Sequence, residues 1–383
     1  MIKTVCASSV AQGAAAFAQF GPVEIIPDSE ITPQAVSSAT ALVVRSKTKV
    51  GPDLLKGSRV RFVGTATAGF DHFDRAWLDH AGIVSASAPG CNANSVAEYV
   101  MAALLCIAAE KRLDLDEMTL GVVGCGNIGS RVARRAEVIG IRVLKNDPPL
   151  AAETGNPDFI PLEHLLKESD IVTLHVPLTT GGPWPTAGLA ACPFFSQIKP
   201  GAVFINTSRG EVVDESALTL SLQNDAVSAA VLDVWRNEPV FSRTLLDLAD
   251  IGSPHIAGYS AQGLLNGTMA VYQELCHFLE EPPAWKPEPA AAPLPPVEMD
   301  TRGLSHEEVL HQMSRSVYDI RADDTLLRRA AAADDETRGR NFTLLRSGYP
   351  VRHEFADARI RLLHADRILT EKAKGLGFCN NPC

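Results

Sequence analysis

The stretch from Thr119 to Pro149, TLGVVGCGNIGSRVARRAEVIGIRVLKNDPP, constrains the fold more than any other part of the chain. It begins with a short apolar run, long enough for one buried parallel strand. Gly124, Gly126 and Gly129 follow with G-x-G-x-x-G spacing and lead into a helical pattern. In a dinucleotide-binding fold, these glycines make the tight turn, let the backbone approach a pyrophosphate, and let helix and strand pack closely. The order therefore predicts a nucleotide-binding unit whose helix N-terminus faces the phosphates.

The second strand pattern of this stretch ends in Asp147, 18 residues after Gly129. This is close to the ~20-residue spacing at which an acidic residue binds the adenine ribose hydroxyls. A carboxylate there repels a 2′-phosphate, and no arginine follows it to clamp one. We therefore predict NAD as the cofactor rather than NADP, although Lys145 would point to the same side and soften the preference. The alternative interpretation is a glycine-rich turn in some other α/β domain.

Length and composition narrow the class of protein. The 383 residues are enough for two or three domains, and the hydrophobic share of 46% is ordinary for a soluble protein. The net charge of −10 disfavours nucleic acid and anionic membranes as partners. The longest strongly apolar run, residues 99–109, is too short to cross a bilayer, and the N-terminus lacks a signal-peptide core. We expect a cytoplasmic protein.

The eight cysteines are scattered and show no zinc-finger spacing. Cys379 and Cys383 lie close together near the end of the chain without a histidine partner, which favours a frayed terminus over a metal site. We predict reduced thiols and no bound metal.

Alternating strand and helix patterns define two α/β lobes. In the first, from Met1 to about Cys91, the predicted strands are residues 3–7, 23–26, 41–44, 61–64 and 83–86. In the second, from Thr119 to about Pro254, further strands are predicted at residues 171–176, 202–206 and 229–234. This alternation predicts parallel sheets with right-handed crossovers and ligands at the carboxyl ends of the strands.

Two helices and a proline-rich segment complete the predicted organisation. Residues 95–110 form an apolar helix between the lobes, and residues 257–279 form a long helix that returns to the first lobe. Residues 281–296 contain seven prolines and suit an extended linker. Residues 301–383 are predicted as a small α+β module that begins with a capping box at Ser305 and Glu308, with helices to residue 336 and strand-like character over residues 341–363.

Three side chains follow predicted strands of the second lobe and suit the oxidation of a 2-hydroxy acid. His255 could accept the hydroxyl proton, since its ordinary pKa is about 6.5. Glu238, 17 residues earlier, could fix the imidazole tautomer and stabilise the cation that forms. Arg209 could hold the substrate carboxylate with a planar, two-pronged cation. Asp233 ends a strand near the predicted nicotinamide site. Each residue alone is more typical of a solvated loop or a turn cap.

Polar donors at the ends of two first-lobe strands suit a phosphorylated substrate. They are Arg45, Ser46, Lys47, Thr65 and Thr67. Hydroxyls and a guanidinium are good partners for a phosphate dianion. The alternative is that RSKTK is a solvated loop.

The chain resembles the D-isomer-specific 2-hydroxyacid dehydrogenase family over roughly residues 1–280. The resemblance lies in the glycine motif and in the motifs at residues 206–210 (NTSRG), 233–239 (DVWRNEP) and 253–257 (SPHIA). It implies that Arg209, Glu238 and His255 are the active-site residues. It also implies a Rossmann-type NAD domain, residues 93–256, inserted in a flavodoxin-like substrate domain, residues 1–92 and 257–285. The linker is then residues 286–300 and the C-terminal dimerisation domain residues 301–383.

Further motifs are similar to those of one group within this family. The members of that group oxidise 4-phospho-D-erythronate to 2-oxo-3-hydroxy-4-phosphobutanoate in pyridoxal 5′-phosphate biosynthesis. The motifs include VRSKTK at residues 44–49, VGTATAGFDH at 63–72, HIAGYS at 255–260 and LRSGYPVRHEF at 345–355. The resemblance implies a homodimer formed by the C-terminal module. The implied substrate-binding residues are Ser46, Thr67 and Tyr259, to which the donor pattern above adds Arg45. The implied NAD-binding residues are Gly124, Gly126, Asn127, Ile128, Gly129, Asp147, Val176, Thr207, Ser208, Asp233 and Gly258. Val176 stands where the family pattern has threonine.

Two alternatives remain open from the sequence. The substrate could be another D-2-hydroxy acid, such as 3-phosphoglycerate. The chain could also be a non-catalytic, NAD-sensing scaffold on the same fold, as in some transcriptional corepressors, although the presence of Arg209, Glu238 and His255 speaks against that.

Overall fold

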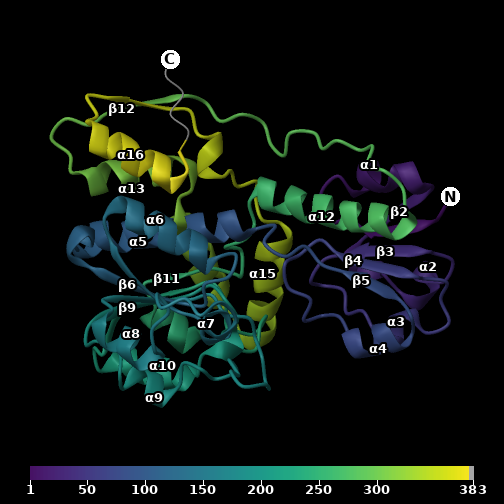
Figure 1. The fold of residues 1–383 in the computed structure, drawn as a ribbon, viewed down its shortest axis with the longest axis horizontal. Helices are drawn as coiled ribbons and strands as arrows, with labels where there is room; N and C mark the ends of the chain where they lie inside the picture. Colours follow the sequence, from purple (N-terminus) through teal and green to yellow (C-terminus); the bar gives the residue numbers. More distant parts are fainter. Residues whose placement is uncertain (379–383) are drawn as a thin grey trace. The chain divides into compact units, whose positions relative to one another are not determined.

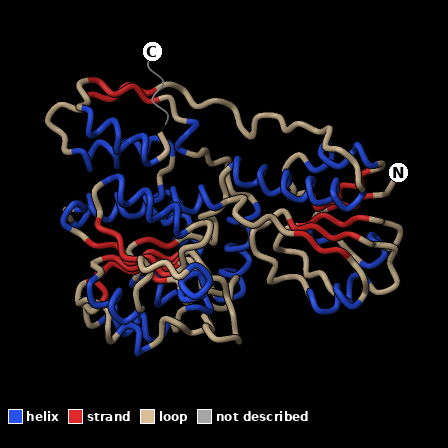
Figure 2. The backbone as a smooth tube through the Cα atoms, viewed as in Figure 1, coloured by secondary structure: helices blue, strands red, loops and turns tan. Residues whose placement is uncertain are grey.

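Two parallel sheets, each with helices on both faces, divide the chain into two units in the computed structural model, which describes residues 1–378 (Figure 1, Figure 2). Unit 1 contains Met1–Asn94 and Tyr259–Ala292, and unit 2 contains Ser95–Gly258 and the chain from Pro293 onward. The C-terminal segment therefore belongs to unit 2, together with the lobe that contains the G-x-G-x-x-G motif. Cys379 and Cys383, considered above as a frayed terminus, lie outside the described residues.

Unit 1 has a five-stranded parallel sheet in the order β2-β1-β3-β4-β5. This is the flavodoxin-like order, as predicted. The strands are β1 (Thr4–Ala7), β2 (Val23–Ile26), β3 (Ala41–Val44), β4 (Phe62–Thr65) and β5 (Val84–Ala86). The helices are α1 (Gly13–Phe17), α2 (Pro33–Val36), α3 (Pro52–Leu55), α4 (Arg75–His80) and α12 (Ala261–Leu279), with 3₁₀ turns at Ala18–Phe20 and Asp28–Glu30.

The sheet of unit 1 is buried on both faces, as continuous apolar strands require. One cluster includes Val63 and Leu78 on the side of α2, α3 and α4, and the other includes Phe62 and Val271 on the side of α1 and α12. The long helix α12 approaches β4 closely, because a Cβ atom on Gly64 would lie 2.2 Å from the Val271 side chain. The predicted long helix is thus confirmed, and it begins at Ala261, after its N-cap Ser260.

Unit 2 has a six-stranded parallel sheet in the order β7-β6-β8-β9-β10-β11. A bridge from Lys145 to Phe159 adds one more position beyond β7, so the first six positions from that edge follow the Rossmann order 3-2-1-4-5-6 and β11 is a seventh. The strands are β6 (Thr119–Val123), β7 (Arg142–Asn146), β8 (Ile171–Leu174), β9 (Ala202–Asn206), β10 (Val227–Leu232) and β11 (Ile251–Gly252). The helices of this lobe are α5 (Ala93–Lys111), α6 (Gly129–Ile139), α7 (Pro148–Thr154), α8 (Leu162–Glu168), α9 (Cys192–Phe195), α10 (Glu215–Gln223) and α11 (Arg243–Leu248).

Figure 1 shows α5 and α6 on one face of this sheet and α8, α9 and α10 on the other. Helix α5 is long and apolar enough to cross a membrane by length and composition, but 83% of its apolar window is buried inside the protein. It is therefore a core helix.

The C-terminal segment contains helices and strands, as the α+β prediction requires, but its first strand lies before residue 301, in the segment predicted as linker. Its elements are β12 (Val297–Asp300), α13 (His306–Val317), α14 (Ile320–Ala331), α15 (Asp335–Ser347), a 3₁₀ turn at Phe355–Asp357, β13 (Ile360–Leu363) and α16 (Arg367–Leu376). Strands β12 and β13 pair in parallel. The capping box of Ser305 and Glu308 is present at the start of α13.

The strand-like prediction over residues 341–363 is wrong for its first part, which belongs to α15. The Asp334 side chain caps this helix by accepting from Thr337 N, at 3.0 Å. Phe342 is buried and packs against Phe241 in a tilted arrangement, with ring centroids 5.5 Å apart, and Phe241 packs in the same way against Trp235. Phe342 therefore belongs to the core of unit 2. This packing decides that the segment is helical, although phenylalanine is common in strands.

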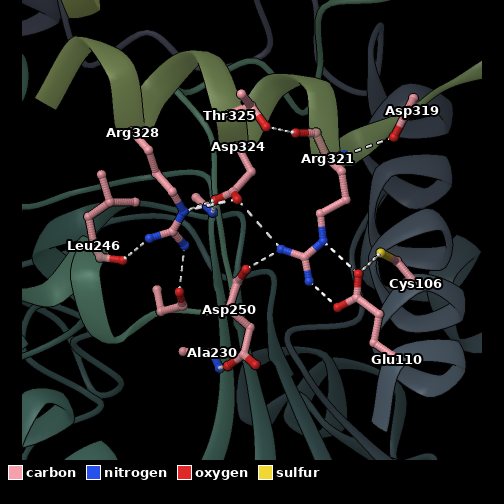
Figure 3. A network of polar contacts seen from close by, with 12 residues as sticks. Cys106, Glu110, Ala230, Leu246, Asp250, Asp319, Arg321, Asp324, Thr325 and Arg328 are labelled. Atoms are coloured by element: carbon pink, nitrogen blue, oxygen red, sulfur yellow. Dashed lines mark hydrogen bonds and ion pairs between the residues drawn. The ribbon is translucent and has the colours of Figure 1, made fainter. Parts of the chain in front are cut away.

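Two arginines of α14 hold the C-terminal module against the rest of unit 2, called here the sheet lobe, which contains the six-stranded sheet (Figure 3). Arg321 pairs with Glu110 of α5 and donates to Asp250 O, just before β11. Arg328 donates to the carbonyl oxygens of Leu246 and Ala249, at 2.8 and 2.6 Å. These contacts satisfy the carbonyl groups at the end of α11.

Residues 281–296 contain no helix or strand and are drawn as loop in Figure 2. The first part of this segment is nevertheless attached to unit 1. The Tyr272 hydroxyl accepts from Ala284 N and Trp285 N, at 2.7 and 2.8 Å, and the Gln12 side chain makes two 3.0 Å hydrogen bonds with the Glu288 backbone.

Candidate active site

The glycine turn between β6 and α6 has the shape that a dinucleotide requires. Gly124 has a φ of 86°, and a Cβ atom on Gly129 would lie 1.9 Å from Gly124 O, so both positions exclude larger residues. A Cβ atom on Gly126 would meet nothing within 4 Å. The backbone at Gly126 therefore borders open space, as it must where a pyrophosphate approaches. The turn fits NAD.

Asp147 ends the second strand beside this turn. Its Oδ2 accepts from Cys125 N at 2.8 Å, and its Oδ1 accepts from Leu150 N at 3.0 Å, capping α7. The two bonds fix the carboxylate next to the glycine turn, which is the place where the sequence predicts a ribose contact. The short helix α7 itself was not predicted.

The other predicted cofactor residues lie at the carboxyl ends of β6, β8 and β9. Asn127 and Ile128 complete the glycine turn. The Val176 side chain lies against this turn, because a Cβ atom on Gly124 would be 2.8 Å from it. Thr207 Oγ1 lies 3.3 Å from His175 Nδ1, and burial lowers the pKa of His175 to about 3, so that ring is neutral. His175 was not singled out from the sequence.

The Asn206 side chain shapes the loop that carries Arg209. Its Oδ1 accepts from Ser208 N and Ser208 Oγ, at 3.0 and 2.8 Å, and its Nδ2 donates to Arg209 O, at 3.0 Å. A Cβ atom on Gly210 would lie 2.0 Å from the carbonyl carbon of Trp235. The Arg209 loop therefore packs directly on the segment that leads to Glu238.

Asp233 organises the loop that carries His255. Its carboxylate accepts from Ser253 Oγ at 2.6 Å, Ile256 N at 2.7 Å and Ala257 N at 3.0 Å. Because Ser253 donates to Asp233, the buried Tyr99 hydroxyl, 2.6 Å from Ser253 Oγ, is the donor to that oxygen. Asp233 is 1% exposed, and its contacts within the chain are those of a loop-fixing residue. Its predicted contact with the nicotinamide stays a prediction, as does the predicted cofactor contact of Gly258, which ends the first segment of unit 2.

Glu238 and His255 form a hydrogen-bonded pair, with 2.8 Å between Oε2 and Nδ1. Glu238 Oε1 accepts from Trp235 N at 2.9 Å, which fixes the carboxylate. Burial raises the pKa of Glu238, but the charge of His255, their hydrogen bond and the Arg346 guanidinium outweigh it and bring this pKa below its usual value. Glu238 is therefore a carboxylate at neutral pH, which makes Nδ1–H of His255 the donor and leaves Nε2 as the proton acceptor.

Two arginines of the C-terminal module reach this site, and sequence reasoning did not select them. Arg346 Nη1 lies 4.0 Å from Glu238 Oε2. Arg352 donates to Ala257 O, two residues after His255. Both belong to the LRSGYPVRHEF motif, but no spacing rule places that motif near Glu238, about 110 residues earlier in the chain.

All four predicted substrate residues belong to unit 1. Arg45 and Thr67 follow the neighbouring strands β3 and β4, and the Arg45 guanidinium lies 4.9 Å from the centre of the Tyr259 ring. Thr67 Oγ1 donates to Gly69 O at 2.8 Å, and Ser46 is exposed. Within residues 1–378, no group of three or more His, Cys, Asp or Glu side chains is arranged to hold a metal ion.

The chain matches known proteins over most of its length. Residues 107–257 match the D-isomer specific 2-hydroxyacid dehydrogenase, NAD binding domain, and residues 292–377 match a domain of unknown function, DUF3410. The chain is 45% identical to the erythronate-4-phosphate dehydrogenase of Salinibacter ruber, over 88% of each chain. It is 42% identical to the enzyme of the same name from Edwardsiella ictaluri, over 98% of this chain and 99% of that one. This chain belongs to the erythronate-4-phosphate dehydrogenase family.

Solved structures agree with this family assignment. The D-lactate dehydrogenase of Aquifex aeolicus, complexed with NAD and lactic acid, has a TM-score of 0.61 and 28% identity, covering 72% of this chain and 95% of that one. The NAD⁺-bound 3-phosphoglycerate dehydrogenase of Entamoeba histolytica has a TM-score of 0.62 and covers 73% of this chain and 95% of that one, but at 24% identity it shows the fold alone. The comparisons confirm an NAD-dependent 2-hydroxyacid dehydrogenase with NAD as its cofactor.

Proposed function

We propose that this chain oxidises 4-phospho-D-erythronate at its 2-hydroxyl to 2-oxo-3-hydroxy-4-phosphobutanoate, in the biosynthesis of pyridoxal 5′-phosphate. The observation that carries the proposal is the Glu238–His255 pair, 2.8 Å apart after β10 and β11 of a Rossmann sheet. The family membership, at 42% identity over 98% of the chain, supports the choice of substrate.

The chemistry assigned to the residues follows from their hydrogen bonds. His255 Nε2 accepts the proton of the 2-hydroxyl, and Glu238 stabilises the imidazolium that results. Arg209 holds the substrate carboxylate, for which a guanidinium has the matching planar geometry. Bound NAD supplies the hydride acceptor. Its pyrophosphate would face the open backbone at Gly126 and its adenine ribose would face Asp147.

The phosphate end of the substrate is assigned to unit 1. Arg45, Ser46 and Thr67 provide a guanidinium and two hydroxyls after neighbouring strands, and the Tyr259 ring packs on Arg45. This donor set suits a phosphate dianion.

A side-by-side assay tests the substrate. Purified protein would be given NAD, a scavenger for the keto product, and either 4-phospho-D-erythronate or 3-phosphoglycerate, with NADH formation as the readout. We expect a higher kcat/KM with 4-phospho-D-erythronate. A higher kcat/KM with 3-phosphoglycerate would show that this acid is the substrate instead. NAD binding without turnover of either acid would favour the non-catalytic scaffold.

We also propose a cytoplasmic homodimer that forms through the C-terminal module. The six cysteines within residues 1–378 are free thiols, which suits a reducing compartment. Leu326 of α14 and Leu344 of α15 are 41% and 60% exposed and line one surface hollow of about 460 Å³. Exposed apolar side chains that border a hollow favour a protein interface at this face.

A further inference from the structure

Arg352 lies in the segment between α15 and β13 and contacts the loop that carries His255. Its Nη2 donates to Ala257 O at 2.5 Å and to Ser95 O at 3.1 Å, and its Nη1 lies 3.4 Å from Ile256 O. The guanidinium carbon is 4.6 Å from the centre of the Tyr318 ring. Arg352 is only 6% exposed, so its charge is held by these carbonyl groups and by the aromatic face.

The backbone of the two residues after His255 is therefore held from both sides. Asp233 accepts from their N–H groups, at 2.7 Å for Ile256 and 3.0 Å for Ala257. Arg352 binds the carbonyl oxygens of the same two residues. A carboxylate and a guanidinium thus fix opposite edges of one short loop.

His255 needs such support because its backbone is unusual. Its φ is 57°, in the left-handed region that a residue with a side chain rarely adopts. Residues keep this conformation only where the surroundings hold them in it.

We propose that Arg352 is a positioning residue for His255, through which the C-terminal module completes the active site of the same chain. The proposal rests on the proposed function in one respect, that His255 is the base. A displacement of about 1 Å in a reacting group can cost about 100-fold in rate. Loss of Arg352 should therefore lower kcat more than it raises KM.

The test compares Arg352→Gln with Arg328→Gln in the full-length protein. Arg328 belongs to the same module and also donates to two backbone carbonyls of the sheet lobe, but at the end of α11 rather than at His255 (Figure 3). We expect Arg352→Gln to lose about 100-fold in kcat with KM for both substrates within about 3-fold. Arg328→Gln should keep kcat within about 3-fold of the wild type. Arg352→Lys, which keeps the charge and one donor direction, should recover part of the loss.

Hydrogen exchange of the peptide that contains residues 253–258 gives a readout independent of turnover. Exchange at Ile256 and Ala257 should be faster in Arg352→Gln and unchanged in Arg328→Gln. If Arg352→Gln fails to fold, Arg352→Lys provides both measurements. Equal losses of kcat in the Gln variants, or normal kcat with unchanged exchange in Arg352→Gln, would overturn the proposal. A wild type inactive on 4-phospho-D-erythronate would instead overturn the proposed function, and the exchange comparison would still decide the role of Arg352.

Discussion

At the scale of single residues, the hydrogen bond between Glu238 and His255 decides which imidazole nitrogen can accept a proton. Replacing His255 by alanine removes that acceptor and leaves the glycine turn intact. We expect His255→Ala to bind NADH normally and to lose at least ~100-fold in turnover. Steady-state kinetics and a fluorescence titration with NADH measure the two effects. His164→Ala, at an exposed position of α8, is the control, and near-normal activity of His255→Ala would remove His255 from the mechanism.

Asp147 should set the choice between NAD and NADP. Two like charges 4 Å apart repel by about 4 kcal/mol at an effective dielectric constant of 20, and tenfold discrimination needs only about 1.4 kcal/mol. Serine removes the charge but can still cap α7. We therefore expect Asp147→Ser to narrow the ratio of kcat/KM for NAD over NADP by at least about tenfold. An unchanged ratio would show that another group faces the ribose.

The sequence could predict a contact between two side chains where each side chain directly follows a strand of the sheet. Glu238 and His255 follow adjacent parallel strands, whose carboxyl ends meet at one edge of the sheet, and the structure places them in contact. Arg346 and Arg352 could not be placed this way. They reach the site through tertiary packing of a module that joins the sheet lobe about 100 residues later in the chain.

At the scale of elements, the glycines of the turn between β6 and α6 have two different roles. Two of them are needed for the fold, and the third leaves room for a ligand. A methyl group at Gly129 would press on Gly124 O, at 1.9 Å, whereas one at Gly126 would enter open space. Overpacking costs about 1–3 kcal/mol, and 1 kcal/mol shifts Tm by roughly 2–4 °C in a domain of this size. We expect Gly129→Ala to lower Tm, and Gly126→Ala to keep Tm but weaken NAD binding. Unaltered NAD affinity in Gly126→Ala would place the pyrophosphate elsewhere.

The contact between α5 and the C-terminal module should make stability depend on pH. Glu98 is buried and accepts from Phe355 N at 2.9 Å. Burial and the charge of Glu354 raise the pKa of Glu98 to about 8, from an ordinary value of 4.5. The folded protein then binds more protons than the unfolded chain between these two values, so stability falls as pH rises through this range.

Glutamine at position 98 removes the titrating group while keeping an acceptor for Phe355 N. We expect Tm of the wild type to fall more between pH 5 and pH 8 than Tm of Glu98→Gln. Differential scanning calorimetry at both pH values measures the difference. Glu163→Gln, at an exposed position of α8, should behave as the wild type, and parallel pH dependence in Glu98→Gln would contradict the assignment.

Most elements of the sheets were predictable because buried parallel strands are continuous apolar runs bounded by turn residues. Strands β2, β3 and β9 have the bounds that the sequence predicts. Helix α7 was missed because it opens with Pro148 and Pro149, which are accepted at the first helical positions but read as a turn. Helix α15 was missed in part because the burial of Phe342 is decided by a partner far away in the sequence.

At the scale of the whole molecule, the two sheet orders predict where each sheet would receive a ligand. The Rossmann sheet of unit 2 changes direction between β6 and β8, beside the glycine turn, and the flavodoxin-like sheet of unit 1 changes direction between β1 and β3. Ligands of open α/β sheets bind at such points. The family resemblance predicted both fold types. The attachment of the C-terminal module to unit 2, by contrast, depends on side-chain contacts such as those of Arg321 and Arg328.

The same module should also decide the oligomeric state. Leu344 is 60% exposed beside the hollow between α14 and α15, and an isologous dimer would bury this face in both copies. A glutamate there would place a charge among the apolar side chains of this face, which is unfavourable. We expect the wild type to have the mass of a dimer of 41.0 kDa chains and Leu344→Glu to have the mass of one chain in light scattering. Leu220→Glu, 57% exposed on α10, is the matched control and should stay dimeric. A monomeric wild type would exclude the dimer, and a dimer that survives Leu344→Glu would place the interface elsewhere.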